Sequence, residues 1–148
     1  MLIVSIIILI LPLTADFSNA KSFGDYEGAI YLRNYDGDTV TFNLPGLHPI
    51  IGEKISIRVN GIDTPEIRGK CEKEKYDAKQ AKEMVADILR DAEQITLKNL
   101  ERGKYFRIVA DVIADGEDLA DMLIEAGMAV RYDGGKKNYK WCDWGEEL

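Results

Sequence analysis

Residues 54–66 read KISIRVNGIDTPE, and this stretch is decisive for predicting the fold. Ile55, Ile57 and Val59 alternate with polar residues, which predicts a strand at about Lys54–Ile62 with one face in a core. Arg58 then points away from that core. The strand must end before Pro65, because proline lacks a backbone donor and pushes the preceding residue toward extended geometry.

Similar patterns on either side of this stretch predict the other elements. Alternation predicts strands at Ala29–Arg33, Thr39–Leu44, Gln94–Leu100 and Tyr105–Ala114. Apolar residues at helical spacing predict helices at Glu72–Asp91 and Asp118–Ala126. Asp115-Gly116 predicts a tight turn, and the Pro- and Gly-rich residues 45–52 predict a loop. Together these elements predict an α+β fold that is mainly β: a five-stranded OB-fold barrel with two to three attached helices.

Two arginines interrupt apolar runs. In the predicted strand Tyr105–Ala114, Phe106 shares a face with the apolar residues that follow, so Arg107 points to the opposite face. Arg58 is placed in the same way in its own strand. The planar guanidinium can bind two oxygens of one anion, which makes both side chains candidates for binding an anionic group.

The length of the chain and its N-terminal residues indicate which domains to expect. A chain of 148 residues can bury one core but is short for two ordinary domains. Residues 2–13 are nearly all aliphatic and lead to a small, polar run that ends at Ala20, which is typical of a secretory signal peptide, although no Lys or Arg precedes it. We expect a signal peptide at 1–20, export to the periplasm or the medium, and one domain at 21–148, with its core at about 26–132 and a tail at 133–148.

The apolar run has other readings as well. It is shorter than the roughly 20 apolar residues of a membrane-spanning helix, so a stable membrane anchor is not expected. A buried N-terminal strand or helix is the remaining alternative. The net charge of −7 excludes bulk electrostatic attraction to nucleic acid as a main source of binding.

Two cysteines, Cys71 and Cys142, lie in the expected exported part. In an oxidising compartment they can form a disulfide, which would stabilise the fold by up to about 4 kcal/mol because it closes a long loop. A zinc site is the alternative, but such sites usually need four ligands, and the sequence has a single histidine, His48. We expect His48 to be a solvated loop residue.

Two acidic segments provide candidate metal ligands. Asp36-Gly37-Asp38 opens a strand, and Gly37 would let the backbone turn so that both carboxylates face one cavity. An ordinary turn is the alternative, and the spacing is not that of an EF-hand. The second segment, residues 63–66, follows the decisive strand and reads DTPE. Its alternative is a helix N-terminal cap.

Taken together, four motifs resemble the staphylococcal nuclease (thermonuclease) family. They are DGDTV at 36–40, IRV at 57–59, GIDTPE at 61–66 and YFR at 105–107. The resemblance spans about Tyr26 to Tyr132. The family usually has a glycine at the position of Phe106, so we expect the backbone before Arg107 to have less freedom here.

The resemblance implies a role for each matching residue. Calcium would be bound by the carboxylates of Asp38 and Asp63 and the carbonyl of Thr64, with Asp36 in support. Glu66 would orient or deprotonate the attacking water, and Arg58 and Arg107 would bind the phosphate. Lys104, Tyr105 and Tyr132 would contact the nucleotide.

The function implied is that of a calcium-dependent endonuclease. It would hydrolyse DNA and RNA with little sequence specificity and leave 3′-phosphate ends. We expect a monomer without an obligate protein partner. The alternatives are a catalytically inactive OB-fold module that binds nucleic acid, and a structural domain stabilised by calcium.

Overall fold

The computed structural model describes residues 22–142. The expected signal peptide and the last residues of the tail lie outside the described residues. Within 22–142, no helix combines the length and the apolar character that crossing a membrane requires.

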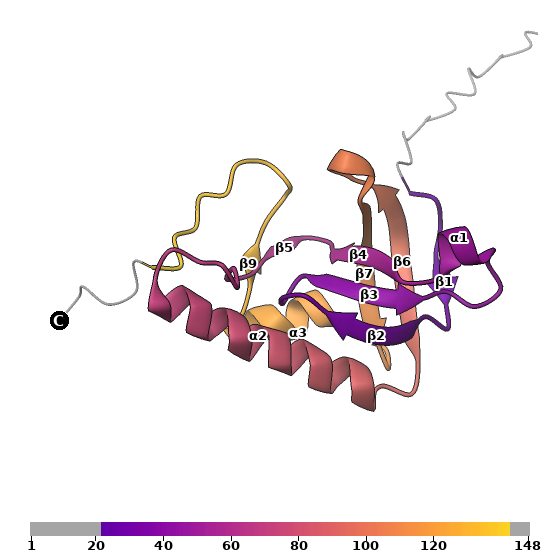
Figure 1. Ribbon diagram of the computed structural model, residues 1–148, viewed down its shortest axis with the longest axis horizontal. Helices are drawn as coiled ribbons and strands as arrows, with labels where there is room; N and C mark the ends of the chain where they lie inside the picture. Colours follow the sequence, from indigo (N-terminus) through magenta and orange to yellow (C-terminus); the bar gives the residue numbers. More distant parts are fainter. Residues whose placement is uncertain (1–21, 143–148) are drawn as a thin grey trace, which may run out of the picture.

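A curled, mainly antiparallel sheet forms the body of the structure (Figure 1). Its strands are β1 (Tyr26–Glu27), β2 (Ile30–Asn34), β3 (Thr39–Asn43), β4 (Ile55–Val59), β6 (Ile95–Arg102), β7 (Ile108–Ala114) and β8 (Glu117–Asp118). The order is β1-β6-β7-β4-β3-β2, with β8 paired to β7. Strands β4 and β7 pair in parallel. Arg58 in β4 and Arg107, which directly precedes β7, therefore come from neighbouring strands. The predicted mainly β, OB-like fold class is confirmed.

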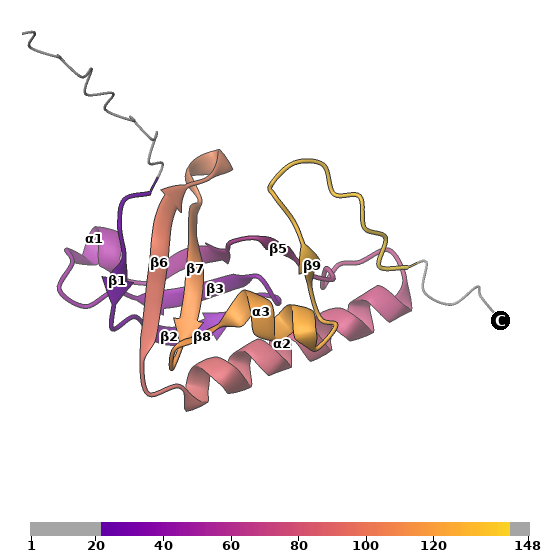
Figure 2. The same cartoon turned by 180° about the vertical axis from the view of Figure 1, so that it is seen from behind.

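The helices are α1 (Pro49–Gly52), α2 (Glu72–Asp91) and α3 (Leu119–Glu125). Helices α2 and α3 lie together on one side of the sheet, whereas α1 lies at the other end, near β1 (Figure 2). The core between sheet and helices contains Phe42, Ile57, Leu97, Leu119 and Leu123, each with 0% of its surface exposed. Burial of each such side chain contributes roughly 1.5–3 kcal/mol.

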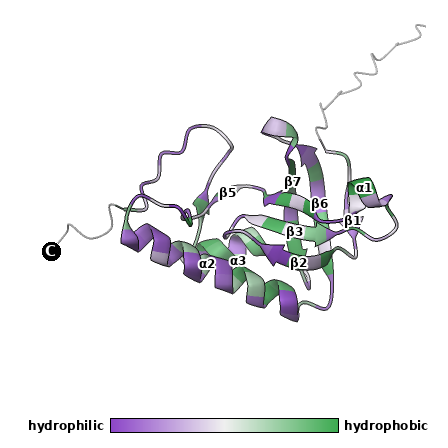
Figure 3. Ribbon diagram, in the orientation of Figure 1, coloured by the Kyte–Doolittle hydropathy of each residue, from purple (hydrophilic) through white to green (hydrophobic). Residues whose placement is uncertain are grey.

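Helix α2 has the bounds that its sequence pattern predicts. Cys71 caps its N-terminus, because its sulfur accepts a hydrogen bond from the backbone N–H of Glu74. Two glutamates in the first turn and Arg90 in the last complement the helix dipole. Hydrophobic and hydrophilic residues alternate around the helix (Figure 3), which packs against β2 and α3.

The decisive stretch 54–66 differs from its prediction in one respect. The backbone turns at Asn60-Gly61, where Gly61 adopts a φ of 74°. The single predicted strand is therefore β4 followed by a short β5 (Ile62–Asp63), which pairs with β9 (Val130–Arg131). This break separates Asp63 from the main sheet and brings it next to the start of the tail.

Two further predictions were wrong. The predicted loop 45–52 contains the single turn of α1, capped by His48, which is exposed as expected. The predicted strand Tyr105–Ala114 begins only at Ile108. Tyr105 and Phe106 instead form a tight turn with φ values of 58° and 59°, and the Phe106 side chain is 85% exposed rather than in the core.

Candidate functional site

A cleft of about 840 Å³ opens beside β4 and the start of β7. It gathers residues from the two acidic segments, from the decisive strand, from the turn before β7 and from the tail. Of the predicted site residues, those that line it are Asp36, Arg58, Glu66, Lys104, Tyr105, Arg107 and Tyr132. The fold therefore brings together side chains that lie up to about a hundred residues apart in sequence.

The other predicted ligands are buried at the junction of the two acidic segments. Asp38 is 2%, Asp63 3% and Thr64 1% exposed. The backbone N–H of Thr64 and its hydroxyl both donate to Asp38 Oδ2, at 3.3 and 3.1 Å. The Asp38 N–H donates to Asp36 Oδ1 at 3.1 Å. The segments are thus directly joined by hydrogen bonds.

Gly37 allows this junction to form, but for a different reason from the one predicted. Its φ is not in the left-handed region, so the turn itself does not demand glycine. A Cβ at this position would lie 2.9 Å from Thr64 Cγ2 and 3.0 Å from the Cβ of Ala81 in α2. Glycine is required because the backbone approaches both neighbours closely.

Replacing Gly37 with alanine should therefore disturb the junction. We expect the variant to lose roughly 1–3 kcal/mol of unfolding free energy through overpacking. Chemical denaturation of Gly37→Ala measures this loss, with Gly135→Ala as the control, since the nearest atom there belongs to an exposed side chain, Asp133. Unchanged stability of Gly37→Ala would contradict the account of the junction.

Arg58 lies between the two acidic segments. It forms an ion pair with Asp38 and a longer one with Asp63, where Nη2 and Oδ1 are 3.7 Å apart. Its Nη2 also donates to the carbonyl of Ile62 at 3.1 Å. Arg107, in contrast, is exposed at the cleft and has no ion pair among the described residues.

The raised pKa of Asp38 indicates that additional positive charge would stabilise its carboxylate. Burial raises the pKa of its carboxyl to about 6, which Arg58 opposes and neighbouring Asp36 reinforces. Because this pKa exceeds its unfolded value, the Asp38 contribution to stability is lost as the pH rises from about 3.8 to about 6, and the cost then stays constant. At neutral pH a further cation near Asp38 would offset that cost.

Asp63 is a buried carboxylate that is compensated by two cationic side chains. Its Oδ1 lies 2.7 Å from the Lys137 ammonium, within hydrogen-bonding distance, and 3.7 Å from Arg58 Nη2. Its Oδ2 accepts from Trp141 Nε1 at 3.4 Å. Carboxylate oxygens are the ligands that hard cations such as calcium prefer, so the donor set fits such an ion.

The carboxylates at the cleft are nevertheless spread apart. Among residues 22–142, the one group of three acidic or sulfur ligands with all donor atoms within 4.8 Å is Cys71, Glu74 and Cys142. The two sulfurs of that group are bonded to each other in a disulfide with a Cα–Cα distance of 6.0 Å. They therefore offer no thiolates to a metal in this form.

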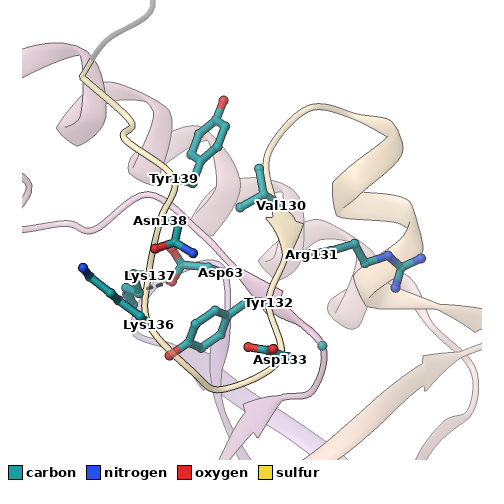
Figure 4. A pocket seen from close by; sticks show the side chains of 10 residues that line it. Asp63, Val130, Arg131, Tyr132, Asp133, Lys136, Lys137, Asn138 and Tyr139 are labelled. Atoms are coloured by element: carbon teal, nitrogen blue, oxygen red, sulfur yellow. Dashed lines mark ion pairs between the residues drawn. The ribbon is translucent and has the colours of Figure 1, made fainter.

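Lys137 and Trp141 belong to the site although no motif singled them out. Lys137 Nζ lies 2.7 Å from Asp63 Oδ1 and 2.7 Å from Glu66 Oε1. Burial lowers the pKa of this ammonium, but the two carboxylates outweigh the effect and hold it well above its usual value. A second hollow, of about 770 Å³, adjoins the cleft here and is lined by Asp63, Lys137 and Tyr132 (Figure 4).

Comparison with known proteins gives two matches. A family model described as "Staphylococcal nuclease homologue" matches residues 56–143, more than half of the chain. An "Uncharacterized 38.1 kDa protein" of Capnoides sempervirens is 25% identical over 132 residues, which cover 88% of this chain. The chain spans 37% of the length of that relative.

Proposed function

Because the chain belongs to the staphylococcal nuclease homologue family, we propose that it is a calcium-dependent endonuclease acting on DNA and RNA. Family membership by itself indicates a nuclease-like function on nucleic acids. The proposal adds the calcium ion, hydrolysis with little sequence specificity, 3′-phosphate products and the roles of individual residues.

The observation that carries the proposal is the cleft that holds Arg58, Glu66 and Arg107 together. These residues come from β4, from the segment after β5 and from the turn before β7. A phosphodiester repels nucleophiles by its charge, and two guanidiniums neutralise charge that develops on its oxygens. A carboxylate beside them, that of Glu66, can accept a proton from the attacking water.

Asp38, Asp63 and the Thr64 carbonyl are the proposed calcium ligands, supported by Asp36. The burial of both carboxylates and the raised pKa of Asp38 support this assignment. A bound calcium ion would act as a Lewis acid toward the phosphate. The chain's own contribution is to keep these oxygens buried and oriented next to Arg58.

The nucleotide contacts would come from the rim of the cleft. Tyr105 is 93% exposed, so one face of its ring is open to a base. Stacking of a base on an aromatic ring contributes roughly 1–3 kcal/mol and is tolerant of sequence, which fits low specificity. Lys104 and Tyr132 line the same cleft and would contact the backbone or the sugar.

We also propose that the chain is exported as a single domain. The Cys71–Cys142 disulfide supports an oxidising compartment, where such bonds persist. Calcium sites of extracellular proteins are often weak, with Kd of about 10⁻⁴ to 10⁻³ M, and still fill where the ion is abundant.

The products test the proposed reaction. Purified protein is incubated with end-labelled DNA and RNA oligonucleotides in calcium, and the new 3′ ends are tested for extension by a polymerase before and after phosphatase treatment. We expect fragments from both substrates that become extendable only after the phosphatase. Binding without fragments would favour the inactive binding module, and ends extendable at once would contradict 3′-phosphate products.

Calcium should stabilise the folded chain. At 10 mM calcium and a Kd of about 1 mM, the gain in unfolding free energy is roughly 1.4 kcal/mol, or about 5 °C in Tm. Differential scanning calorimetry with and without calcium measures it. Asp38→Asn should abolish the calcium shift, whereas the surface control Asp87→Asn should retain it. A full shift in Asp38→Asn would remove Asp38 from the ligand set.

A further inference from the structure

Lys137 is a cation built into the candidate site. Its ammonium lies 2.7 Å from the buried Asp63 Oδ1 and 2.7 Å from Glu66 Oε1, and Figure 4 shows it directed at Asp63. We propose that Lys137 competes with the divalent cation for these carboxylates and so sets the metal concentration at which the site fills. The inference rests on the proposed metal-binding role of Asp63.

The tail segment, residues 133–142, is fixed at both ends, which keeps Lys137 in place. At its end, Cys142 is bonded to Cys71, just before α2. Trp141 is 9% exposed and donates to Asp63 Oδ2. Figure 1 shows the tail leaving β9 and returning to the first turn of α2. Because the folded tail already restricts the position of Lys137, little further conformational entropy is lost when its ammonium contacts Asp63.

The start of the tail is held by the rim of the cleft. The Tyr132 hydroxyl donates to the carbonyl of Gly135 at 2.8 Å, and Lys104 Nζ donates to that of Gly134 at 3.2 Å. Both donors are predicted nucleotide contacts. The segment that carries Lys137 is thus held in place by side chains that also belong to the candidate site.

The ammonium and a divalent cation would need the same oxygen. Lys137, and the more distant Arg58, supply the charge compensation of Asp63 Oδ1. The Lys137 side chain is 42% exposed, which gives the ammonium a route to solvent when another cation takes its position.

The distances between the carboxylates at the cleft agree with the presence of cationic side chains between them. Over residues 22–142 the carboxylates at the cleft do not form a group with all ligand atoms within 4.8 Å. Arg58 bridges Asp38 and Asp63, and Lys137 bridges Asp63 and Glu66. Binding of a divalent ion to Asp63 must therefore release at least one of these contacts, and the exposed Lys137 is the one more easily released.

Calcium affinity tests the inference without reference to activity. Isothermal titration calorimetry of the disulfide-bonded protein with calcium chloride compares the wild type with Lys137→Met and with Lys136→Met. Lys136 is the matched control, because it has the same charge and is exposed in the same segment. We expect Lys137→Met to bind calcium on the order of tenfold more tightly, as two close carboxylates lose a competing charge. Lys136→Met should stay within about twofold of wild type, since its charge is screened by solvent.

The outcomes separate this inference from the proposed function. Wild type that binds calcium, with Lys137→Met equal to it or weaker, overturns the competition and leaves the calcium site standing. Binding by Lys137→Met alone supports the competition in its strongest form. Absence of binding in all three proteins overturns both. Lys137→Gln is measured in parallel, with Tm and near-UV circular dichroism, so that a folding defect in one variant does not decide the result.

Discussion

Glu66→Gln is expected to lower kcat by about 10² to 10⁴, because glutamine cannot accept the proton of the attacking water. The change keeps the shape of the side chain and its place in the cleft. Its effect on KM should be small, since Glu66 is not a proposed phosphate contact. Steady-state cleavage of a fluorescent oligonucleotide at saturating calcium measures both constants.

Loss of stability should not explain this effect. The Glu66 side chain is 49% exposed, and its ion pair with Lys137 is of a kind worth about 0–1 kcal/mol. Glu72→Gln is the matched control, since Glu72 is an exposed glutamate paired to Lys75 on α2, outside the cleft. Near-wild-type kcat in Glu66→Gln would remove Glu66 from its assigned role.

Arg107→Gln is expected to lower kcat/KM by about 10² or more, because the variant lacks one of two cations aimed at the developing charge. Arg107→Lys should recover part of the loss, since it keeps the charge but not the planar fork. Arg107 is a cleaner test than Arg58, whose removal would leave the buried carboxylates of Asp38 and Asp63 without their shared partner.

The control for this experiment is Arg90→Gln. Arg90 is paired with Asp87 at the far end of α2 and does not line the cleft. Thermal unfolding should give Tm values close to wild type for both variants, because Arg107 has no ion pair among the described residues and the Arg90–Asp87 pair is exposed. Equal activity of Arg107→Gln and Arg90→Gln would show that Arg107 takes no part in the reaction.

Local patterns were sufficient to predict most of the fold. Helix α2 has the predicted bounds because its cap, dipole charges and apolar stripe all lie within its own sequence. The turn at Asp115-Gly116 followed from its residue types, and both residues adopt positive φ. The turn at Asn60-Gly61 was missed, although Asn-Gly is a turn signal and Ile62 is out of phase with Ile55, Ile57 and Val59.

The turn before Arg107 shows how tertiary geometry overrides a strand pattern. The chain must reverse between β6 and β7, and Gly103 N–H donates to the carbonyl of Arg107 at 2.7 Å to close that reversal. Phe106 then has a φ of 59°, a conformation that glycine adopts without strain. The prediction of reduced backbone freedom identified the right residue, but the strand prediction placed its ring on the wrong side.

The family was predicted from motifs and is confirmed, whereas part of the site could not be read from them. Lys137 lies in a tail without periodicity, so no pattern of its own marks it. One signal was present: if Cys142 pairs with Cys71, the tail must return to within a few residues of Glu66. Contacts that depend on such a long-range closure are set by the tertiary fold and not by local sequence.

A calcium titration of DNA cleavage tests whether this cleft is a calcium-dependent nuclease site. The rate of cleavage of plasmid DNA is measured as calcium is raised from zero, in excess chelator, to 10 mM. We expect no cleavage in chelator and a rate that saturates with a half-point of about 10⁻⁴ to 10⁻³ M. Cleavage at an undiminished rate in chelator, or none at any calcium concentration, would contradict the proposal.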